Sequence, residues 1–181
     1  MKILIASDIH GSAYYCKLLL DRIREERPDG IFLLGDILYH GPRNDLPRDY
    51  DPKKVIAMLN PLSDMITAVR GNCDAEVDQT VLDFDLMQTC REVDIDGVHM
   101  LLTHGHHYNK EKPFCHNDGY VMLNGHFHVP EITDRGDFLY VNCGSVSIPK
   151  ENSACSYMIY ENRTFTLKDV TTGSTVMIKN I

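Results

Sequence analysis

Five short apolar runs in this sequence each end in a polar motif beside a glycine. The runs are rich in β-branched and aliphatic residues and are bounded by turn formers, which is typical of buried strands. The motifs are Asp8-Ile9-His10-Gly11, Gly35-Asp36, Gly71-Asn72-Cys73-Asp74, Thr103-His104-Gly105-His106 and Gly125-His126-Phe127-His128. If the five strands share a sheet, their carboxyl ends meet at the crevice where open α/β sheets bind ligands. Acid, amide and imidazole side chains from distant parts of the chain would then lie together.

The length and composition are those of one globular domain. A chain of 181 residues with 43% hydrophobic content can bury a sizeable core, so we expect a single domain over residues 1–181. No apolar run approaches the ~18 residues of a membrane span, and Met1 and Lys2 lead into a strand rather than a signal peptide. We therefore expect no membrane partner and a cytoplasmic location. The six cysteines lack a C-x-x-C spacing, which predicts reduced thiols rather than a disulfide or zinc framework.

The net charge of −8 restricts the partners of the chain. Nucleic-acid binding depends on clustered lysine and arginine side chains that displace counterions, so DNA or RNA is not an expected partner. A small anionic substrate stays open, because two divalent cations would reverse the local field.

The remaining pattern predicts an α/β fold whose second half is rich in strands. Ser12 can cap a helix that ends near Arg27, and a second helix is expected over residues 53–60. Between them, residues 40–52 predict a surface loop over the site, because they contain prolines and a glycine. Further predicted elements are a hairpin over 91–103 with its turn at Asp96-Gly97, a loop or short helix over 107–118, and strands near 131–133, 138–141, 154–160, 164–170 and 175–178. These elements predict two packed β-sheets flanked by helices.

Single motifs differ in how strongly they indicate a metal. Asp8 and His10 alone are equally well explained by a helix cap and a polar loop. His126 and His128 are more informative, because alternation in an extended segment sends both imidazoles to one side, where neither a core nor a solvated strand needs them. Two imidazoles that point together favour a metal site.

In order and context, the five motifs resemble those of the calcineurin-like metallophosphoesterase superfamily. Its pattern is Asp-x-His, Gly-Asp, Gly-Asn-His-Asp/Glu, a glycine-flanked His and Gly-His-x-His, and the similarity runs from Met1 to about Ser145. The short length and the Gly-Asn-Cys-Asp motif are most similar to the compact bacterial and archaeal YfcE-type phosphodiesterases. The resemblance implies a four-layer α-β-β-α sandwich.

The resemblance also implies two divalent metal ions per chain that share the carboxylate of Asp36. The two ligand sets would be Asp8, His10, Asp36 and His128, and Asp36, Asn72, His104 and His126. Oxygen and nitrogen ligands without thiolate suit Mn²⁺, our first choice, and also Mg²⁺, Ni²⁺, Fe²⁺ or Zn²⁺. A hydroxide between the two ions would attack a phosphodiester in line, with no covalent enzyme intermediate.

Cys73 is where the chain departs from the superfamily pattern. Most members have a histidine there, which can protonate the leaving oxygen or bind the phosphoryl group. A thiol is neutral at pH 7 and a poor hydrogen-bond donor, so we expect weak general-acid help and a preference for good leaving groups. The alternative is a small packed side chain without a chemical role.

Further residues receive roles from the same resemblance. Asn72, Cys73 and Asp74 form the implied catalytic set, in which Asp74 would orient a ligand or a water; its alternative role is a helix cap. Arg43 and His106 are candidate contacts to the substrate phosphate. Their alternatives are a surface arginine and a solvated loop histidine.

Two functions from different classes fit this fold. The first is a metal-dependent phosphodiesterase that acts on small phosphodiesters, supported by a competent residue at every ligand position. The second is a non-catalytic binding scaffold, as in a retromer subunit of the vacuolar sorting machinery, which could lose His10 or Asn72 freely. A nuclease is disfavoured by the charge. We expect any large exposed apolar patch to mark self-association of the chain.

Overall fold

The computed structural model describes residues 1–114 and 119–181. Cys115 and the end of the segment predicted as a loop or short helix over 107–118 lie outside these residues. The five other cysteines, Cys16, Cys73, Cys90, Cys143 and Cys155, are free thiols. Among the described residues, no helix combines the length and apolar character that a membrane span requires.

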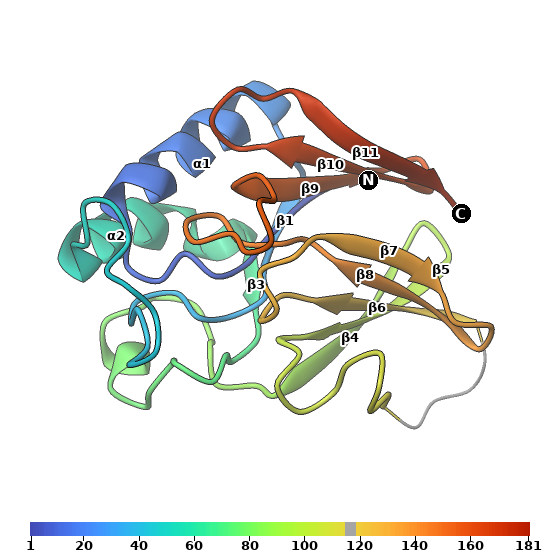
Figure 1. Cartoon of the computed structure of the whole chain (residues 1–181), viewed down its shortest axis with the longest axis horizontal. Helices are drawn as coiled ribbons and strands as arrows, with labels where there is room; N and C mark the ends of the chain where they lie inside the picture. The colour runs from blue at the N-terminus through green and yellow to red at the C-terminus, as the bar shows by residue number, and fades with distance from the viewer. Residues whose placement is uncertain (115–118) are drawn as a thin grey trace.

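The described chain folds into two β-sheets with helices packed on one of them (Figure 1). The strands are β1 (Lys2–Ala6), β2 (Gly30–Leu33), β3 (Ile66–Ala68), β4 (Cys90–Ile95), β5 (Val98–Thr103), β6 (Tyr120–Asn124), β7 (Glu131–Asp134), β8 (Phe138–Asn142), β9 (Ser156–Glu161), β10 (Thr164–Asp169) and β11 (Thr175–Asn180). The helices are α1 (Ala13–Glu26) and α2 (Pro52–Leu59), with the 3₁₀ turns η1 (Asn60–Met65) and η2 (Asp78–Thr80). The predicted α/β class with two packed sheets is confirmed.

The five motif-bearing strands do not share one sheet. β1, β2 and β3 run parallel in a six-stranded sheet of order β11-β10-β9-β1-β2-β3. β5 and β6 run parallel in a second sheet of order β4-β5-β6-β8-β7. The hairpin of β4 and β5 starts this second sheet, so the chain changes sheets after β3. The shared crevice therefore lies between two sheets rather than along one.

Local sequence accounts for the predicted elements. The Ser12 side chain accepts a hydrogen bond from the Tyr15 amide and caps α1, and the Asp51 side chain caps α2 in the same way. Asp96 and Gly97 both have positive φ, as the tight turn between β4 and β5 requires. The second helix and the hairpin therefore form where the sequence predicts them.

Three apolar clusters hold the layers together. Cys16, Leu19 and Ile23 of α1 pack with Val55 and Leu59 of α2 on one face of the six-stranded sheet. The other face packs against the five-stranded sheet in a second cluster, which joins Ile3 and Ile5 to Leu102 and Leu123. Because both faces of the sheet are covered, β1 and β2 are apolar and buried at every position after their first residue.

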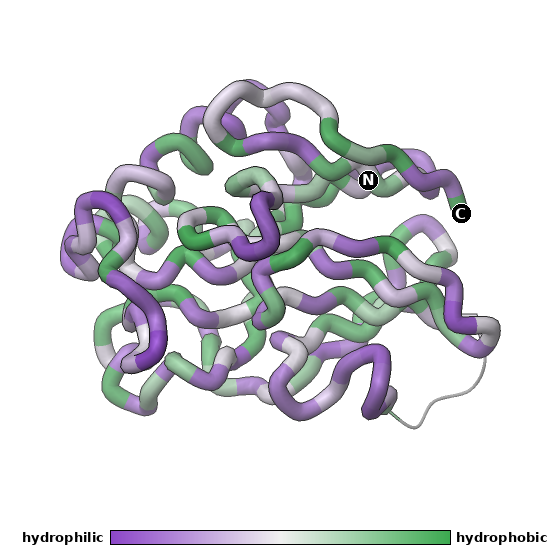
Figure 2. Tube along the Cα trace, in the orientation of Figure 1, coloured by the Kyte–Doolittle hydropathy of each residue, from purple (hydrophilic) through white to green (hydrophobic). Residues whose placement is uncertain are grey.

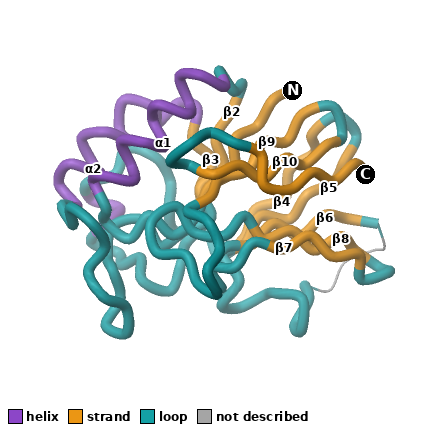
Figure 3. Tube along the Cα trace, turned by 45° about the horizontal axis from the view of Figure 1, so that its top comes forward, coloured by secondary structure: helices purple, strands orange, loops and turns teal. Residues whose placement is uncertain are grey.

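Among the described residues, a side chain of the loop after β5 packs on the outer face of the five-stranded sheet. Leu101, Tyr120 and Tyr140 form a third cluster there, against which Phe114 packs. Loops also gather at one end of both sheets, where they appear in teal in Figure 3. The loop after β2 is mainly hydrophilic, as Figure 2 shows, and matches the predicted surface loop over residues 40–52.

Candidate metal centre

The seven side chains predicted as metal ligands converge at the carboxyl ends of β1, β2, β3, β5 and β6. Asp8, His10, His104 and His128 are almost fully buried, as is Asp36, whereas His126 is partly buried and Asn72 is exposed. Ligand atoms of Asp8, His10 and His128 lie within 4.8 Å of one another, and so do those of Asp36, His104 and His126. The structure thus brings together residues that the sequence separates by as many as five strands.

The first group surrounds the carboxylate of Asp8. Oδ1 of Asp8 lies 3.1 Å from Nε2 of His128 and 3.4 Å from Nε2 of His10. Nδ1 of His10 bonds to the Tyr39 carbonyl at 2.8 Å, and Nδ1 of His128 bonds to the Ile148 carbonyl at 2.7 Å. A carbonyl only accepts, so Nδ1 carries the hydrogen and Nε2 is directed at the centre.

The second group surrounds the carboxylate of Asp36. Nε2 of His104 lies 3.4 Å from Asp36 Oδ2 and 3.2 Å from Asn72 Oδ1. His104 also donates from Nδ1 to the Leu34 carbonyl at 2.6 Å, and Nδ1 of His126 is 3.2 Å from its Nε2. Asp36 Oδ2 is also 3.7 Å from His10 Nε2. Asp36 therefore faces both groups, as expected of a bridging carboxylate.

The electrostatics of the centre favour a cation. Burial alone would raise the pKa of Asp8, but the adjacent imidazoles of His10 and His128 hold that pKa well below its usual range. Burial alone would likewise lower the pKa of His104, but the Asp36 carboxylate raises it to about 9. The carboxylates thus stay ionised in a buried position, where positive charge must balance them.

Orphaned acceptor atoms show that the residues fit a metal. Oδ1 of Asp8 is buried and accepts no hydrogen bond from the described residues. The Nε2 atoms of His10 and His128 are only 3.3 Å apart, and two neutral imidazoles with hydrogen on Nδ1 cannot bond through those atoms. A divalent cation would satisfy all three atoms, and the oxygen and nitrogen donors suit a first-row or alkaline-earth ion.

Five of the seven residues proposed as ligands have an uncommon backbone conformation. Asp8, His10, Asp36, His126 and His128 all have positive φ, between 49° and 66°. Such conformations are uncommon for residues other than glycine and persist only where the surroundings fix them.

Glycines allow the strand ends to approach one another at this point. A Cβ at Gly125 would overlap the Ser7 hydroxyl and lie 2.6 Å from Asp8 Oδ2, and a Cβ at Gly71 would overlap the carboxylate of Asp36. The glycines of these two motifs therefore have a steric cause.

Asp74 positions the ends of two strands. Its Oδ2 accepts hydrogen bonds from the amides of Asp36 and Gly71, each at 2.7 Å, and its Oδ1 accepts from the Ile37 amide at 2.8 Å. Both oxygens are thus occupied by the main chain, and burial raises the pKa of this carboxyl. The geometry fits the predicted orienting role, and the carboxylate acts through the backbone of Asp36.

Cys73 lies at the edge of the centre. Its amide donates to Asp36 Oδ1 at 2.7 Å, and its sulfur lies within 4.8 Å of ligand atoms of His10 and Asp36. Burial, together with the nearby Asp36, raises the pKa of the thiol to about 12. The side chain is therefore neutral at pH 7, in line with the prediction of a poor proton donor.

The two candidate phosphate contacts lie in different places. Arg43 lines a cavity of about 360 Å³ with Asp36, Asn72 and Lys150. His106 lines a neighbouring cavity with Arg70 and His107, on the other side of Asn72. Burial and the nearby His104 lower the pKa of His106 to about 4, so its imidazole is neutral at pH 7.

Sequence reasoning missed Lys150 and Ser147, whereas Ser145 belongs to a strand-end turn, residues 142–145, for which the family resemblance implies a positioning role at most. Lys150 faces the cavity of Arg43 because its amide bonds to the carbonyl of His128 at 3.1 Å. The hydroxyls of Ser145 and Ser147 donate to the Asp8 carbonyl at 2.9 and 3.1 Å and fix the β1 end. No motif marks Lys150 or Ser147.

Comparison with known proteins assigns the family. The profile of the calcineurin-like phosphoesterase superfamily domain matches residues 1–164. The chain is 41% identical over 162 residues to phosphodiesterase YfcE of Escherichia coli K12. The aligned residues make up 90% of this chain and 88% of that protein. The chain belongs to the calcineurin-like phosphoesterase superfamily.

Solved structures support the same family. The structure of YfcE, a phosphoesterase from Escherichia coli, matches with a TM-score of 0.97 and 38% identity over the whole of both chains. Vps29 from Entamoeba histolytica, crystallised with Zn²⁺, matches with a TM-score of 0.67 and 19% identity over 100% of this chain and 98% of that chain. The second likeness shows a shared fold alone.

Proposed function

We propose that this chain hydrolyses small phosphodiesters by attack of a hydroxide that bridges two divalent metal ions. The observation that carries the proposal is the pair of ligand groups that both face Asp36, together with a buried Asp8 oxygen in the first group that accepts no hydrogen bond from the described residues. Family membership and 41% identity to a phosphodiesterase make the chain a phosphoric diester hydrolase.

Each metal position has its own ligands. Asp8, His10 and His128 would hold one ion, and Asn72, His104 and His126 the other, with Asp36 shared. Two bound ions would supply a nucleophilic hydroxide near neutral pH and neutralise the phosphoryl oxygens. We propose Mn²⁺ as the first ion to test, followed by Mg²⁺, Ni²⁺, Fe²⁺ and Zn²⁺.

The chain's own residues would bind the substrate and handle its charge. Arg43 and Lys150 place two cations in the lining of the cavity, where they would attract an anionic diester and contact its free oxygens. Cys73 would leave the departing oxygen without an efficient proton donor, because its thiol is neutral and a weak donor. These properties favour diesters whose leaving group departs unprotonated.

The scaffold alternative rests on the shared fold of Vps29. A scaffold would bind its partner with or without metal, and its ligand positions would be free to change. This chain keeps a competent side chain at all seven positions, which favours the enzyme.

We also propose that the protein works in the cytoplasm.

We further propose that a second copy of the chain is its macromolecular partner. β11 ends the six-stranded sheet, and its six residues are all exposed, with Val176 at 50% and Ile178 at 61%. An exposed apolar edge strand can pair with another chain. Light scattering should give the mass of a dimer, and a monomer mass at high concentration would remove this proposal.

An activity panel tests the proposed function. The protein is stripped of metal, loaded with each divalent ion and assayed on phosphodiesters and phosphomonoesters. We expect hydrolysis of the diesters, and loss of both activity and bound metal in Asp36→Ala because Asp36 faces both groups. An Asp36→Ala variant with the parent rate and metal content would show that the bridging assignment is wrong.

A further inference from the structure

A mostly apolar groove of about 380 Å³ opens beside the candidate metal centre. We propose that this groove binds a planar aromatic group on one ester arm of the substrate. The inference rests on the proposed function, since it concerns the part of a diester that extends beyond the phosphoryl group. The residues that define the groove are Tyr39, Tyr50, Ile56, Cys73, Val77 and Val81.

The groove is continuous with the metal centre at two residues. Cys73 lines the groove, and its sulfur lies within 4.8 Å of ligand atoms of His10 and Asp36. Tyr39 also lines the groove, and its carbonyl accepts the hydrogen bond from His10 Nδ1 at 2.8 Å. A diester whose phosphoryl group is bound at the centre therefore has the groove within reach of an ester arm.

Two glycines shape the inner end of the groove. A Cβ at Gly11 would lie 2.5 Å from a ring carbon of Tyr50, and a Cβ at Gly41 would lie 2.9 Å from the sulfur of Cys73. Both glycines have positive φ. The chain thus packs the Tyr50 ring and the Cys73 thiol directly against the loops that carry His10 and Tyr39.

The chemistry of the walls fits an aromatic group. Tyr39, Val77 and Val81 are 41%, 66% and 42% exposed, so large apolar surfaces face water around the groove. The rings of Tyr39 and Tyr50 each lie edge-on to His40, at 4.7 and 5.2 Å between centroids. Apolar walls with aromatic edges are typical of subsites that bind rings.

The neighbouring cavity has the opposite character. It is lined by Arg43 and Lys150, which suit the charged oxygens of a diester. Cys73 in the groove follows Asn72 in the cavity, and its sulfur lies within 4.8 Å of a ligand atom of Asp36, which also lines the cavity. The carboxylate of Asp78 also lines the groove, but it already accepts a hydrogen bond from the Ala75 amide at 2.8 Å.

Two phosphonates test the groove without hydrolysis. Phenylphosphonate and methylphosphonate share the phosphoryl oxygens and differ in the ring. Isothermal titration calorimetry on the Mn²⁺-loaded chain should give phenylphosphonate about a tenfold lower Kd, the effect of burying one ring. The Val77→Asn and Val81→Asn double variant should lose most of this preference. Val176→Asn changes a similarly exposed valine on β11, outside the groove; it is the matched control and should keep the preference, whether or not it also weakens self-association.

The outcomes separate this inference from the proposed function. Equal affinity of the parent protein for both phosphonates would overturn the groove assignment while leaving the metal centre intact. A preference that survives in the double variant would also overturn it, provided thermal unfolding shows that the variant is folded. If neither phosphonate binds the loaded protein, the proposed function itself fails, and the groove inference fails with it.

Discussion

At the scale of single residues, three of the histidines proposed as metal ligands are oriented by main-chain carbonyls. His10, His104 and His128 each donate from Nδ1 to a carbonyl in a neighbouring loop, at distances between 2.6 and 2.8 Å. Such partners fix the ring and the tautomer, which leaves Nε2 for the metal. The geometry of the proposed centre therefore depends on the positions of these loops as much as on the histidines themselves.

Replacing Cys73 by histidine tests the role of the missing imidazole. If weak protonation of the leaving group limits the enzyme, Cys73→His supplies a donor of reference pKa ~6.5. kcat/KM should then rise more for an alkyl or nucleoside ester than for a nitrophenyl ester, with metal content unchanged. General-acid help is commonly worth ~10²–10⁴-fold, so even a small part of it is measurable.

The two other results of this substitution have distinct meanings. An equal change for both ester types would indicate altered phosphate binding rather than proton donation. No change for either ester would indicate that Cys73 has a packing role only. The Cys90→His variant is a suitable control, because Cys90 is a partly buried free thiol in β4, outside the ligand groups.

At the scale of elements, the site depends on the contact between the end of β1 and the end of β6. Gly125→Ala should separate these ends, because the added Cβ would overlap the Ser7 hydroxyl and crowd Asp8. Overpacking of this kind typically costs about 1–3 kcal/mol of unfolding free energy. We also expect a metal affinity about 10–100-fold weaker, as for other lost supports of a ligand.

Gly30→Ala is the matched control for this substitution. Gly30 starts β2, and its added Cβ would meet only the flexible end of Ile3 at 3.3 Å and, at 3.9 Å, the Met65 carbonyl. Urea unfolding and metal titration of both variants give the comparison. A Gly125→Ala protein with the parent's metal affinity would show that the sheet contact does not position Asp8.

Much of the element structure could be predicted from local sequence. The cap at Ser12, the turn at Asp96 and Gly97, and the apolar runs before each motif are local signals, and each marks an element that the structure contains. The division of the motif strands between two sheets is not local, because an apolar run does not specify its neighbouring strand.

The site could be predicted only as far as its motifs extend. The proposed ligands lie at strand ends, which predicts that they converge, and their ligand atoms do lie within 4.8 Å of one another in each group. Lys150 reaches the cavity through a hydrogen bond to the main chain at His128, which no spacing reveals. The groove of Tyr39 and Val77 likewise joins two loops that are distant in sequence.

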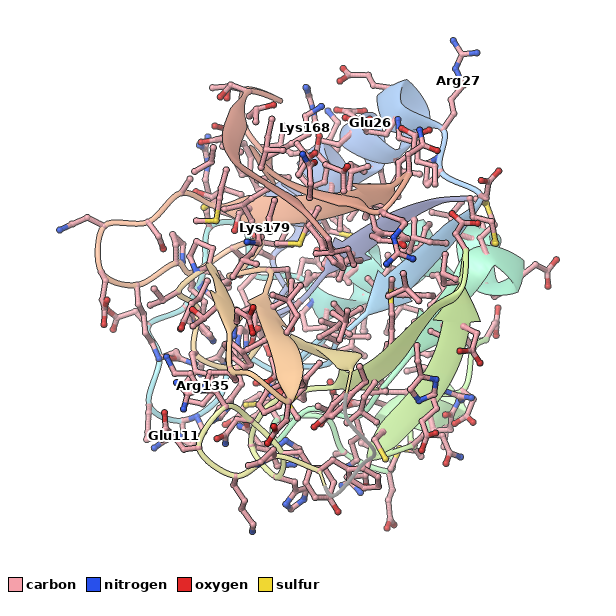
Figure 4. All side chains as sticks on the ribbon, turned by 90° about the vertical axis from the view of Figure 1, so that its right-hand side faces the viewer. Glu26, Arg27, Glu111, Arg135, Lys168 and Lys179 are labelled. Carbon is pink, nitrogen blue, oxygen red and sulfur yellow. The ribbon has the colours of Figure 1, made fainter. Side chains whose placement is uncertain are left out.

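At the scale of the whole molecule, an ionic cluster connects the first helix to both ends of the chain. Glu26 at the end of α1 pairs with Lys2 of β1 at 2.7 Å and with Lys168 of β10, and Tyr157 donates to it at 3.2 Å. Figure 4 shows Glu26 beside Lys168. Burial alone would raise the pKa of Glu26, but the hydrogen bonds from the two lysines lower it.

This shift predicts an acid-sensitive contribution to stability. A carboxyl whose pKa is lower in the folded state stabilises the fold above the unfolded pKa of about 4.3, and the contribution is lost as pH falls through the folded pKa. Glu26→Gln should therefore reduce the free energy of unfolding at pH 7 and have a smaller effect at pH 3. Urea unfolding with a chelator present excludes metal release as the cause. An equal effect at both pH values would contradict the assignment.

The central claim is that this fold assembles a centre for two metal ions, and the direct measurement is elemental analysis of the carefully loaded protein. We predict two ions per chain at neutral pH, because two groups of ligand atoms lie close together and Asp36 faces both of them. We also predict that loaded protein hydrolyses phosphodiesters. Less than one ion per chain, together with inactivity in every metal tested, would contradict the account.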